Sequence, residues 1–433
     1  MRLALLSRSL LLRDAGIVGG LSVAAFGGQR ATGVDSGLAS FALASVVSSA
    51  RRSGVWQLHP ILEQASWTVV LQTALILGVW ASRSRIQQIG ATNPSGTRIT
   101  AVKIVPMLVA FALGCIGTML GSFCGVKCAT RFASRGTSSS VWPIAASCLA
   151  ASYTGGTANF FEVANLLGAL QGPVARALSL IAGIDILVMV VYFGILLSLR
   201  SWVAVGKDKS LSFLSFLYSD AGTNAQTNVV SVSAKSGQST FLGRRKLLGA
   251  ALVVVIAGLL ALTAAQVQRL LPRVPGLSVM ASVLSAVYLA SNSPVLGLAS
   301  PAALSASCEL TLGVFYAVLG LGCRIQDVFS VGPSILLLML ITLAVHLTTL
   351  LLGSWVWNRS CRDSSNAIDV DTAIIASNAC VGGASTAASM AAGLKNSDPN
   401  LPMLGSLAGV LGYVVGTPLG LALAASLKVP LPQ

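Results

Sequence analysis

The sequence predicts an all-α, polytopic membrane protein made of two internal repeats of transmembrane helices, each with a broken or re-entrant Gly-Gly element. The first observation is composition, because 54% of the 433 residues are hydrophobic and 9% are charged, against about 25% charged in soluble proteins. The second is a set of long stretches without Asp, Glu, Lys, Arg or His, each long enough to span a bilayer. These stretches are Ile104–Val126, Leu247–Ala265, Gly276–Cys308 and Leu401–Leu427. The third is a pair of glycine-rich interruptions at matching places in the two halves.

The segments between the stretches support the same class of protein. Lys and Arg number 28 against 13 Asp and Glu, and the excess lies in short loops between apolar runs, as is typical of membrane proteins. Leucine-rich runs without period-2 alternation argue against an outer-membrane barrel. No nucleic-acid-binding motif is present, so we expect no nucleic-acid partner. The eight cysteines are scattered and predict no zinc site, which needs four ligands. We expect no metal and no cofactor.

The chain divides into four parts. Residues 1–60 are rich in Arg, Ser, Gly and Ala, which is transit-peptide composition; a poorly packed first span or a cytosolic tail is the alternative. Residues 61–199 form the first transmembrane repeat, residues 200–246 a polar linker loop, and residues 247–433 the second half. The expected apolar segments are 65–82, 104–126, 141–168, 177–199, 247–266, 276–293, 304–322, 331–357, 372–394 and 401–427.

Two of these segments, 141–168 and 372–394, carry the Gly-Gly pairs. A shift of 227 residues places Gly155-Gly156 on Gly382-Gly383 and brings the neighbouring apolar segments into register, as an internal duplication would. A re-entrant segment 141–168 would make the two repeats antiparallel, whereas a full crossing would not; the sequence leaves this open. Unwound backbone in a bilayer has to line an enclosed or watery cavity, so we expect a binding site between the breaks.

The first break supplies carboxylates and an amide. Asn159 and Glu162 follow Gly155-Gly156 and lie within one helical turn of each other, and their oxygens could bind Na⁺ or an ammonium group; Glu162 could instead mark the aqueous end of a hairpin. Asp185 lies within the next apolar segment, where an acid is a functional candidate for binding H⁺ or Na⁺. Its alternative is an acid that reaches the interface or pairs with a base.

The second break supplies an amide and hydroxyls. Asn378, Ser385 and Thr386 flank Gly382-Gly383, and helix N-termini at such a break favour anions. The alternative is that these small residues only allow close helix packing. His346 and Glu309 lie within other apolar segments and are candidate proton relays, although a membrane His also serves as a neutral packing residue.

Several runs together resemble the membrane family catalogued as domain of unknown function 819. They are Ala151–Phe160, Asp185 with Tyr192-Phe193, Val345–Leu347, Ser377–Gly383 and Gly409–Thr417. The family is distantly similar to the cation/proton antiporter and anion symporter clan, which implies secondary transport without naming a substrate, and its plant members are thought to be plastid proteins. Members usually carry two further hydrophobic segments before the one that matches 65–82, whereas this chain is Arg-rich there.

The chain carries no HExxH, GxSxG or Walker A signature, so we expect no enzymatic activity. The sequence predicts an ion-coupled secondary transporter that moves a small organic anion or amino acid by alternating access. A monovalent cation/proton antiporter and a non-transporting scaffold that retains the fold are the alternatives. The expected partners are membrane lipid, Na⁺ or H⁺ and a small-molecule substrate, with a homodimer left open. We expect a multi-pass protein of a plastid or mitochondrial inner membrane.

Overall fold

A computed structural model describes most of the chain. The described residues are 2–32, 36–49, 65–92, 103–132, 141–170, 172–205, 244–271, 276–292, 299–321, 325–361, 366–394 and 400–429, with the single residues 297 and 398. They form fourteen α-helices and one short π-helical segment, with no strand among them. The prediction of an all-helical fold is confirmed for these residues. Most of the predicted 200–246 linker lies outside them.

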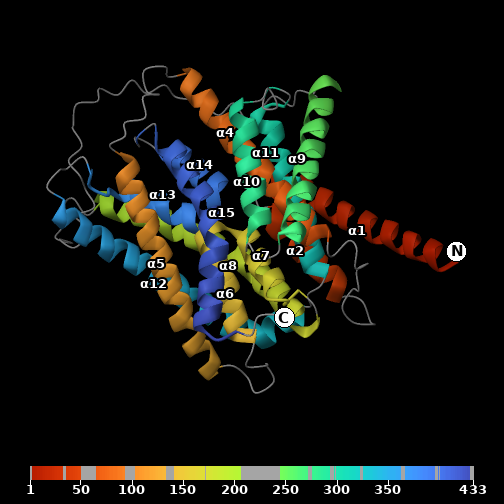
Figure 1. The fold of residues 1–433 in the computed structure, drawn as a ribbon, viewed down its shortest axis with the longest axis horizontal. Coiled ribbons are helices and arrows are strands. Elements are labelled where there is room, and N and C mark those ends of the chain that lie inside the picture. The colour runs from red at the N-terminus through yellow and green to blue at the C-terminus, as the bar shows by residue number, and fades with distance from the viewer. Residues whose placement is uncertain are drawn as a thin grey trace.

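The helices are arranged as one bundle (Figure 1). In the first half they are α1 (Arg2–Thr32), α2 (Ser36–Ser49), the π-helical segment η1 (Ser66–Val70), α4 (Leu71–Thr92), α5 (Ile104–Phe132), α6 (Val141–Gly155), α7 (Thr157–Leu166) and α8 (Gly172–Val205). In the second half they are α9 (Arg244–Leu270), α10 (Leu277–Asn292), α11 (Pro301–Leu321), α12 (Ile325–Ser360), α13 (Val370–Val381), α14 (Gly383–Gly393) and α15 (Leu401–Ser426).

Six of the described helices are long and apolar enough to cross a membrane, so the chain is a multi-pass membrane protein. These stretches are Ile104–Arg131, Ala177–Arg200, Leu248–Leu270, Pro301–Val318, Pro333–Ser360 and Leu401–Ser426. Helix α9 exposes one row of large apolar side chains, which include Leu248, Leu252, Val255 and Leu259. Such a row can face lipid, because contact with lipid tails costs an apolar side chain no free energy.

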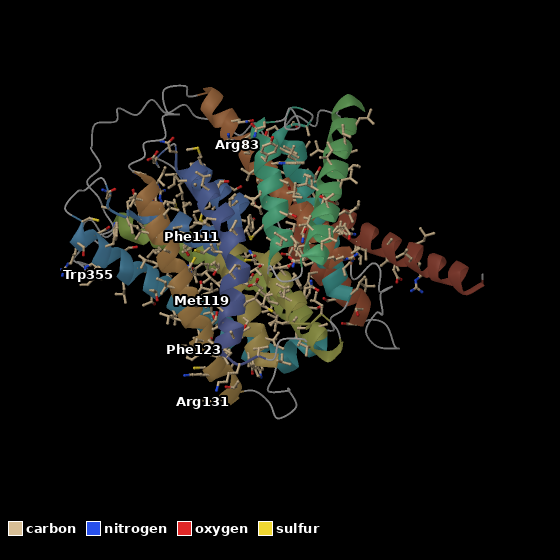
Figure 2. The ribbon with its side chains drawn as sticks, viewed as in Figure 1. Arg83, Phe111, Met119, Phe123, Arg131 and Trp355 are labelled. Carbon is tan, nitrogen blue, oxygen red and sulfur yellow. The ribbon has the colours of Figure 1, made fainter. Side chains whose placement is uncertain are left out.

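Helices α5 and α12 pack against each other along a stripe of glycines. A Cβ atom added to Gly117 or Gly121 of α5 would lie 2.8 or 2.6 Å from backbone atoms of α12. Small residues at this spacing allow two helix backbones to approach closely. Figure 2 shows Phe111, Met119, Phe123 and Arg131 following one another along α5. The pair of helices forms a continuous wall beside the two broken segments.

The N-terminal helices are packed into the bundle. The ring of Phe41 on α2 lies against Gly183 of α8, and the backbone of α2 lies against Gly320 of α11. Ser48 Oγ donates a hydrogen bond of 2.9 Å to the Leu321 carbonyl, which fastens α2 to α11. Residues 36–49 therefore contribute buried surface to the folded protein. The transit peptide remains a prediction.

Polar contacts hold the N-terminal end of α13. Lys103 Nζ lies 3.3 Å from carboxylate oxygens of both Asp369 and Asp398, and Asp369 caps α13 by accepting the Thr372 N–H. Burial lowers the pKa of Lys103, but the two carboxylates raise it by more, so it lies above its ordinary value. Arg200 of α8 binds both oxygens of Asp371. These contacts fix the N-terminal end of α13, and the second break follows the opposite end of the helix.

Truncating Phe41 to Ala should destabilise the protein by about 3–5 kcal/mol, because it leaves a cavity between α2, α8 and α11. Leu43→Ala is the matched control, since Leu43 lies on the same helix and is 41% exposed. Thermal unfolding in detergent would measure both variants. Equal melting temperatures for the two variants would show that α2 is dispensable.

Candidate functional site

The first break is a short reversal of the chain between α6 and α7. Gly156 separates the two helices with φ 78° and ψ 173°, a conformation that favours glycine. Its N–H donates to the Ser152 carbonyl at 2.6 Å, which closes the last turn of α6. The N–H groups of the first turn of α7 then begin a new helix, whose N-terminus carries a partial positive charge.

Helix α15 lies along both arms of this break. Gly412 is against Gly155, Gly416 is against both Ala151 and Asn159, and Gly420 is against both Ser147 and Val163. Each of the last two glycines therefore meets residues of both α6 and α7. The arms of the break run side by side along α15.

Asn159 ties the first break to α15. Its Nδ2 donates to the Gly155 carbonyl at 2.7 Å, and its Oδ1 accepts from Thr417 Oγ1 at 2.7 Å and from Thr417 N at 3.2 Å. Both lone pairs of that amide oxygen are used. Asn159 could act as an ion or substrate ligand only if these bonds were broken. In this structure its side chain holds α7 against α15.

The second break separates α13 from α14 at Gly382 and Gly383. Gly382 N–H donates to the Asn378 carbonyl at 2.7 Å, and Gly383 has φ 82°. Gly405 of α15 lies against both Ile375 and Ala387, and Gly409 lies against Gly383 and Ala384. The second pair of arms therefore lies along the N-terminal half of α15, as the first pair lies along its C-terminal half.

The polar residues of the second break bond mainly to one another. Thr386 Oγ1 donates to Asn378 Oδ1 at 2.7 Å and approaches the Gly383 carbonyl at 3.1 Å. Asn378 is buried, and its Nδ2 contacts Met390 Sδ at 3.3 Å. These bonds brace the reversal and leave the Ser385 and Thr386 side chains at the border of a cavity.

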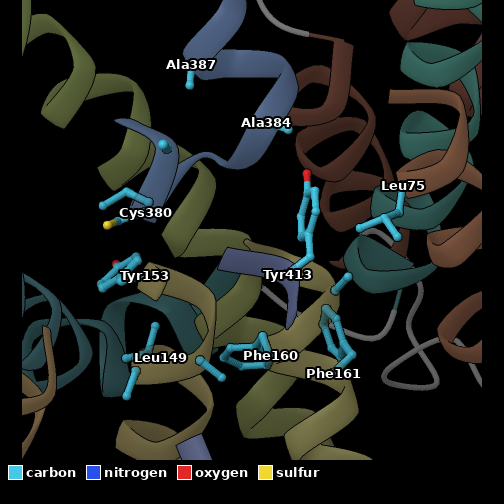
Figure 3. Packing of buried hydrophobic residues seen from close by; sticks show 14 of the residues in the cluster. Leu75, Leu149, Tyr153, Phe160, Phe161, Cys380, Ala384, Ala387 and Tyr413 are labelled. Atoms are coloured by element: carbon cyan, nitrogen blue, oxygen red, sulfur yellow. The ribbon is translucent and has the colours of Figure 1, made fainter. Parts of the chain in front are cut away.

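Tyr413 of α15 lies between the two breaks (Figure 3). A Cβ atom on Gly156 would be 3.4 Å from its ring, and one on Gly383 would be 2.6 Å from its hydroxyl oxygen. The hydroxyl accepts a hydrogen bond from the Ala384 N–H, in the first turn of α14. One side chain therefore contacts both reversals and satisfies an N–H that the break leaves without a helical partner.

One cavity of about 220 Å³ is bordered by both breaks. Its lining includes Gly156 and Thr157 from the first break, and Gly382, Ser385 and Thr386 from the second. Glu309 of α11 and Tyr413 also line it, together with apolar residues of α4 and α8. A wider cavity of about 560 Å³ shares Glu309, Ser385 and Thr386 and extends to Asn378 and Ser389. The structure thus brings Glu309, predicted as a relay, to the cavity between the breaks.

Asp185 lies behind this cavity. It is 1% exposed, and its Oδ2 accepts a hydrogen bond from Ser152 Oγ at 3.3 Å. Ile186 and Met189 of the same helix line the cavity, whereas Asp185 itself does not. The hydroxyl of Tyr153 also interacts with the Asp185 carboxylate. Asp185 faces the last turn of α6, directly before the first break.

The remaining candidates occupy two separate places. Glu162 accepts a hydrogen bond from Ser278 Oγ of α10 at 2.9 Å and does not line the cavity. His346 is fully buried on α12, with Nδ1 2.8 Å from Thr118 Oγ1 and Nε2 3.0 Å from Ser377 Oγ. No group of three His, Cys, Asp or Glu side chains within the described part of the chain could hold a metal ion.

Sequence reasoning did not single out Tyr413, Thr417, Ser152 or Ser377 as site residues. All four lie in the runs that carry the family resemblance, which was their available signal. Each of these residues was identified by its contacts with helices that are distant in the sequence. A single sequence does not reveal such contacts.

Comparison with known proteins gives one finding and two absences. A family model described as "Protein of unknown function (DUF819)" matches residues 98–429. No curated protein and no solved structure matches the chain.

Replacing Gly383 by Ala should destabilise the protein by about 1–3 kcal/mol, because alanine is strained at positive φ and its Cβ would meet the Tyr413 hydroxyl. Gly393→Ala is the matched control on the same helix, since no atom lies within 4 Å of a Cβ there. Thermal unfolding of the purified variants would test this. An unchanged melting temperature for Gly383→Ala would mean that this reversal relaxes without cost.

Proposed function

The chain belongs to the family of proteins of unknown function DUF819, and from that premise we propose that it is an ion-coupled secondary transporter. It would move a small organic anion or amino acid by alternating access. The observation that carries the proposal is the single cavity bordered by both chain reversals and by Glu309. Broken helices that meet at a cavity are how transporters of this kind expose backbone groups to a substrate.

We infer that the two breaks are re-entrant hairpins of two inverted repeats. In the first hairpin Ala151 and Asn159 meet α15 at one level, and in the second Ile375 and Ala387 do so. This geometry supports arms that return toward the side from which they came. With re-entrant hairpins, five crossings separate α4 from α11, so the two halves have opposite orientation. The hairpins then point at each other from opposite sides, with Tyr413 between their tips.

Pairings elsewhere in the bundle support the same repeat. Helix α2 packs against α11, and α10 packs against α4; α1 packs against α2 and α11, and α9 packs against α10 and α4. Each pairing in one half therefore has a counterpart in the other. On this basis α1 and α2 are the equivalents of α9 and α10. They would be the first two helices of the first repeat, in the region that is too Arg-rich to be identified as two apolar spans from composition.

The chemistry of the cavity favours a substrate with both a carboxylate and an amino group. The first turns of α7 and α14 border it, and helix N-termini attract anions. Ser385 and Thr386 add hydroxyls, and Glu309 adds a carboxylate that favours a cationic group. A volume of about 220 Å³ suits a small molecule. An amino acid satisfies both charges, whereas a dicarboxylate would be repelled by Glu309.

Asp185 is the proposed coupling-ion carboxylate. It is buried beside the end of α6 and faces Ser152, so its charge state acts on the helix that leads into the first break. An ionised acid in hydrocarbon is costly, and binding of H⁺ or Na⁺ would remove that cost. Ion binding at Asp185 and substrate binding in the cavity would thereby favour the same arrangement of the hairpins.

Uptake into proteoliposomes tests the function. Radiolabelled amino acids and small carboxylates, supplied under H⁺ and Na⁺ gradients, should reveal gradient-driven uptake that Asp185→Asn lowers by at least about tenfold. Glu309→Gln should raise KM for amino acids about tenfold or more and leave carboxylates without an amino group less affected, because it removes the partner of the amino group.

Ser179→Ala serves as a matched control on α8, since among the described residues the Ser179 hydroxyl bonds to the Ala175 carbonyl of its own helix and to no other group. Dissipation of a pH gradient by Na⁺ or K⁺ alone would identify a cation/proton antiporter. Uptake that is independent of every gradient and unchanged in Asp185→Asn would contradict ion coupling. No flux of any compound, with variants altering only stability, would indicate a scaffold.

A further inference from the structure

A chain of buried hydroxyl groups extends from Asp185 to His346. It comprises Tyr153 of α6, Tyr192 of α8 and Ser377 of α13, which are at most 4% exposed. Tyr192 Oη lies 2.7 Å from Ser377 Oγ, and Ser377 Oγ lies 3.0 Å from His346 Nε2. The Tyr153 hydroxyl is close to both Asp185 and Tyr192. A hydroxyl both donates and accepts, so each member could pass on a proton.

The middle of this chain is not locked by other hydrogen bonds. Apart from their interaction with each other, Asp185 Oδ1 and the Tyr153 hydroxyl are buried and have no hydrogen-bond partner among the described residues. The Tyr153 O–H is therefore able to rotate between the carboxylate and Tyr192. At the far end, His346 Nδ1 faces Thr118 Oγ1 at 2.8 Å, and Thr118 Oγ1 also donates to the Tyr153 carbonyl at 3.2 Å.

The polar and titratable groups described near Asp185 and His346 come from helices α5, α6, α8 and α13. On α5 the neighbouring groups are Thr118 and Cys115, on α13 they are Ser377 and Cys380, and α6 and α8 contribute Ser152 and the two tyrosines. The ion pairs made by the described residues of α8 and α13 lie at the helix ends, as Arg200 with Asp371 does. Within the described network the imidazole of His346 is the group that can become positive.

We propose that the coupling ion is a proton, and that Tyr153, Tyr192 and Ser377 conduct it between Asp185 and His346. The proposal rests on the proposed function, because it assigns the ion of the same Asp185 site. One carboxylate and a few hydroxyls supply few oxygen ligands for Na⁺, whereas an imidazole takes part in proton transfer. These residues form a row of hydroxyl groups that ends in hydrogen bonds between Tyr192 and Ser377 and between Ser377 and His346, rather than a cluster of oxygen ligands.

The transfer moves one proton and no electrons. Asp185 gives its proton to the Tyr153 oxygen as Tyr153 passes its own to Tyr192, and Tyr192 and Ser377 repeat the exchange. The last O–H bond to break is that of Ser377, and the new N–H bond forms at His346 Nε2. The product is a carboxylate and an imidazolium whose Nδ1–H points at Thr118 Oγ1.

The position of the proton is thereby linked to both hairpins. Tyr153 lies two residues before Gly155 on the arm of the first hairpin, and Ser377 lies on the arm of the second. A proton on His346 strengthens its hydrogen bonds to Thr118 and Ser377, because charge-assisted bonds are stronger than neutral ones. Protonation would therefore tighten α5 and α13 against α12.

Infrared spectroscopy of the purified full chain tests the link. The carboxyl band of Asp185 is identified as the C=O band lost in Asp185→Asn, and it is followed during pH titrations and pH jumps. In His346→Gln the midpoint of this band should move upward by about one pH unit, a tenfold change in proton affinity, because the alternative site for the proton is gone. In Ser377→Ala and Tyr192→Phe the band should respond to a pH jump about tenfold more slowly.

Ser179→Ala should keep both the midpoint and the rate of the wild type, and thermal unfolding confirms that each variant is folded. A purely structural role for His346 would change melting temperature without moving the midpoint, and would overturn the proposal. So would an Asp185 band that responds to Na⁺ at constant pH. Absence of gradient-driven uptake with an intact spectroscopic link would reject the transporter function and leave the proton link standing.

Discussion

The structure depends on how the backbone is satisfied where two helices break inside an apolar bundle. Each unwound turn leaves N–H and C=O groups that lipid cannot satisfy. Here α15 lies against both breaks, because glycines at 405, 409, 412, 416 and 420 let the arms approach its backbone. Tyr413 then contacts both reversals from the middle of the same helix. Close packing against one continuous helix is what makes two interruptions tolerable.

This constraint divides the polar residues around the breaks into two groups. Asn159 and Asn378 use their amide oxygens within the protein, in bonds to Thr417 and Thr386. The cavity lining includes the hydroxyl or carboxyl groups of Thr157, Glu309, Ser385, Thr386 and Tyr413. The side chains that brace the breaks are therefore mostly different from those that line the cavity. Asp185, the carboxylate proposed to bind the coupling ion, belongs to neither group and does not line the cavity.

The N-terminal region shows why composition was insufficient. Arg, Ser, Gly and Ala are typical of transit peptides, and the same small residues also allow close helix packing. Ser45 and Ser48 bond to carbonyls near the end of α11, and Phe41 lies against Gly183 and Gly320. None of these partners is local, so a composition window over residues 1–60 carried no information about them.

The sequence by itself determined the class of protein, the approximate limits of most helices, and the two points where helices end at a Gly-Gly pair. These features are local, since apolar runs of spanning length and glycine at positive φ depend on neighbouring residues alone. Only the tertiary structure decided which candidates meet. It placed Glu309 at the cavity, and it brought Asn159 within hydrogen-bond reach of Thr417. It also brought His346 within hydrogen-bond reach of Ser377, 31 residues later in the chain. Those choices depend on the packing of helices distant in the chain, because a side chain's partner is set by which neighbouring backbone comes within hydrogen-bond reach.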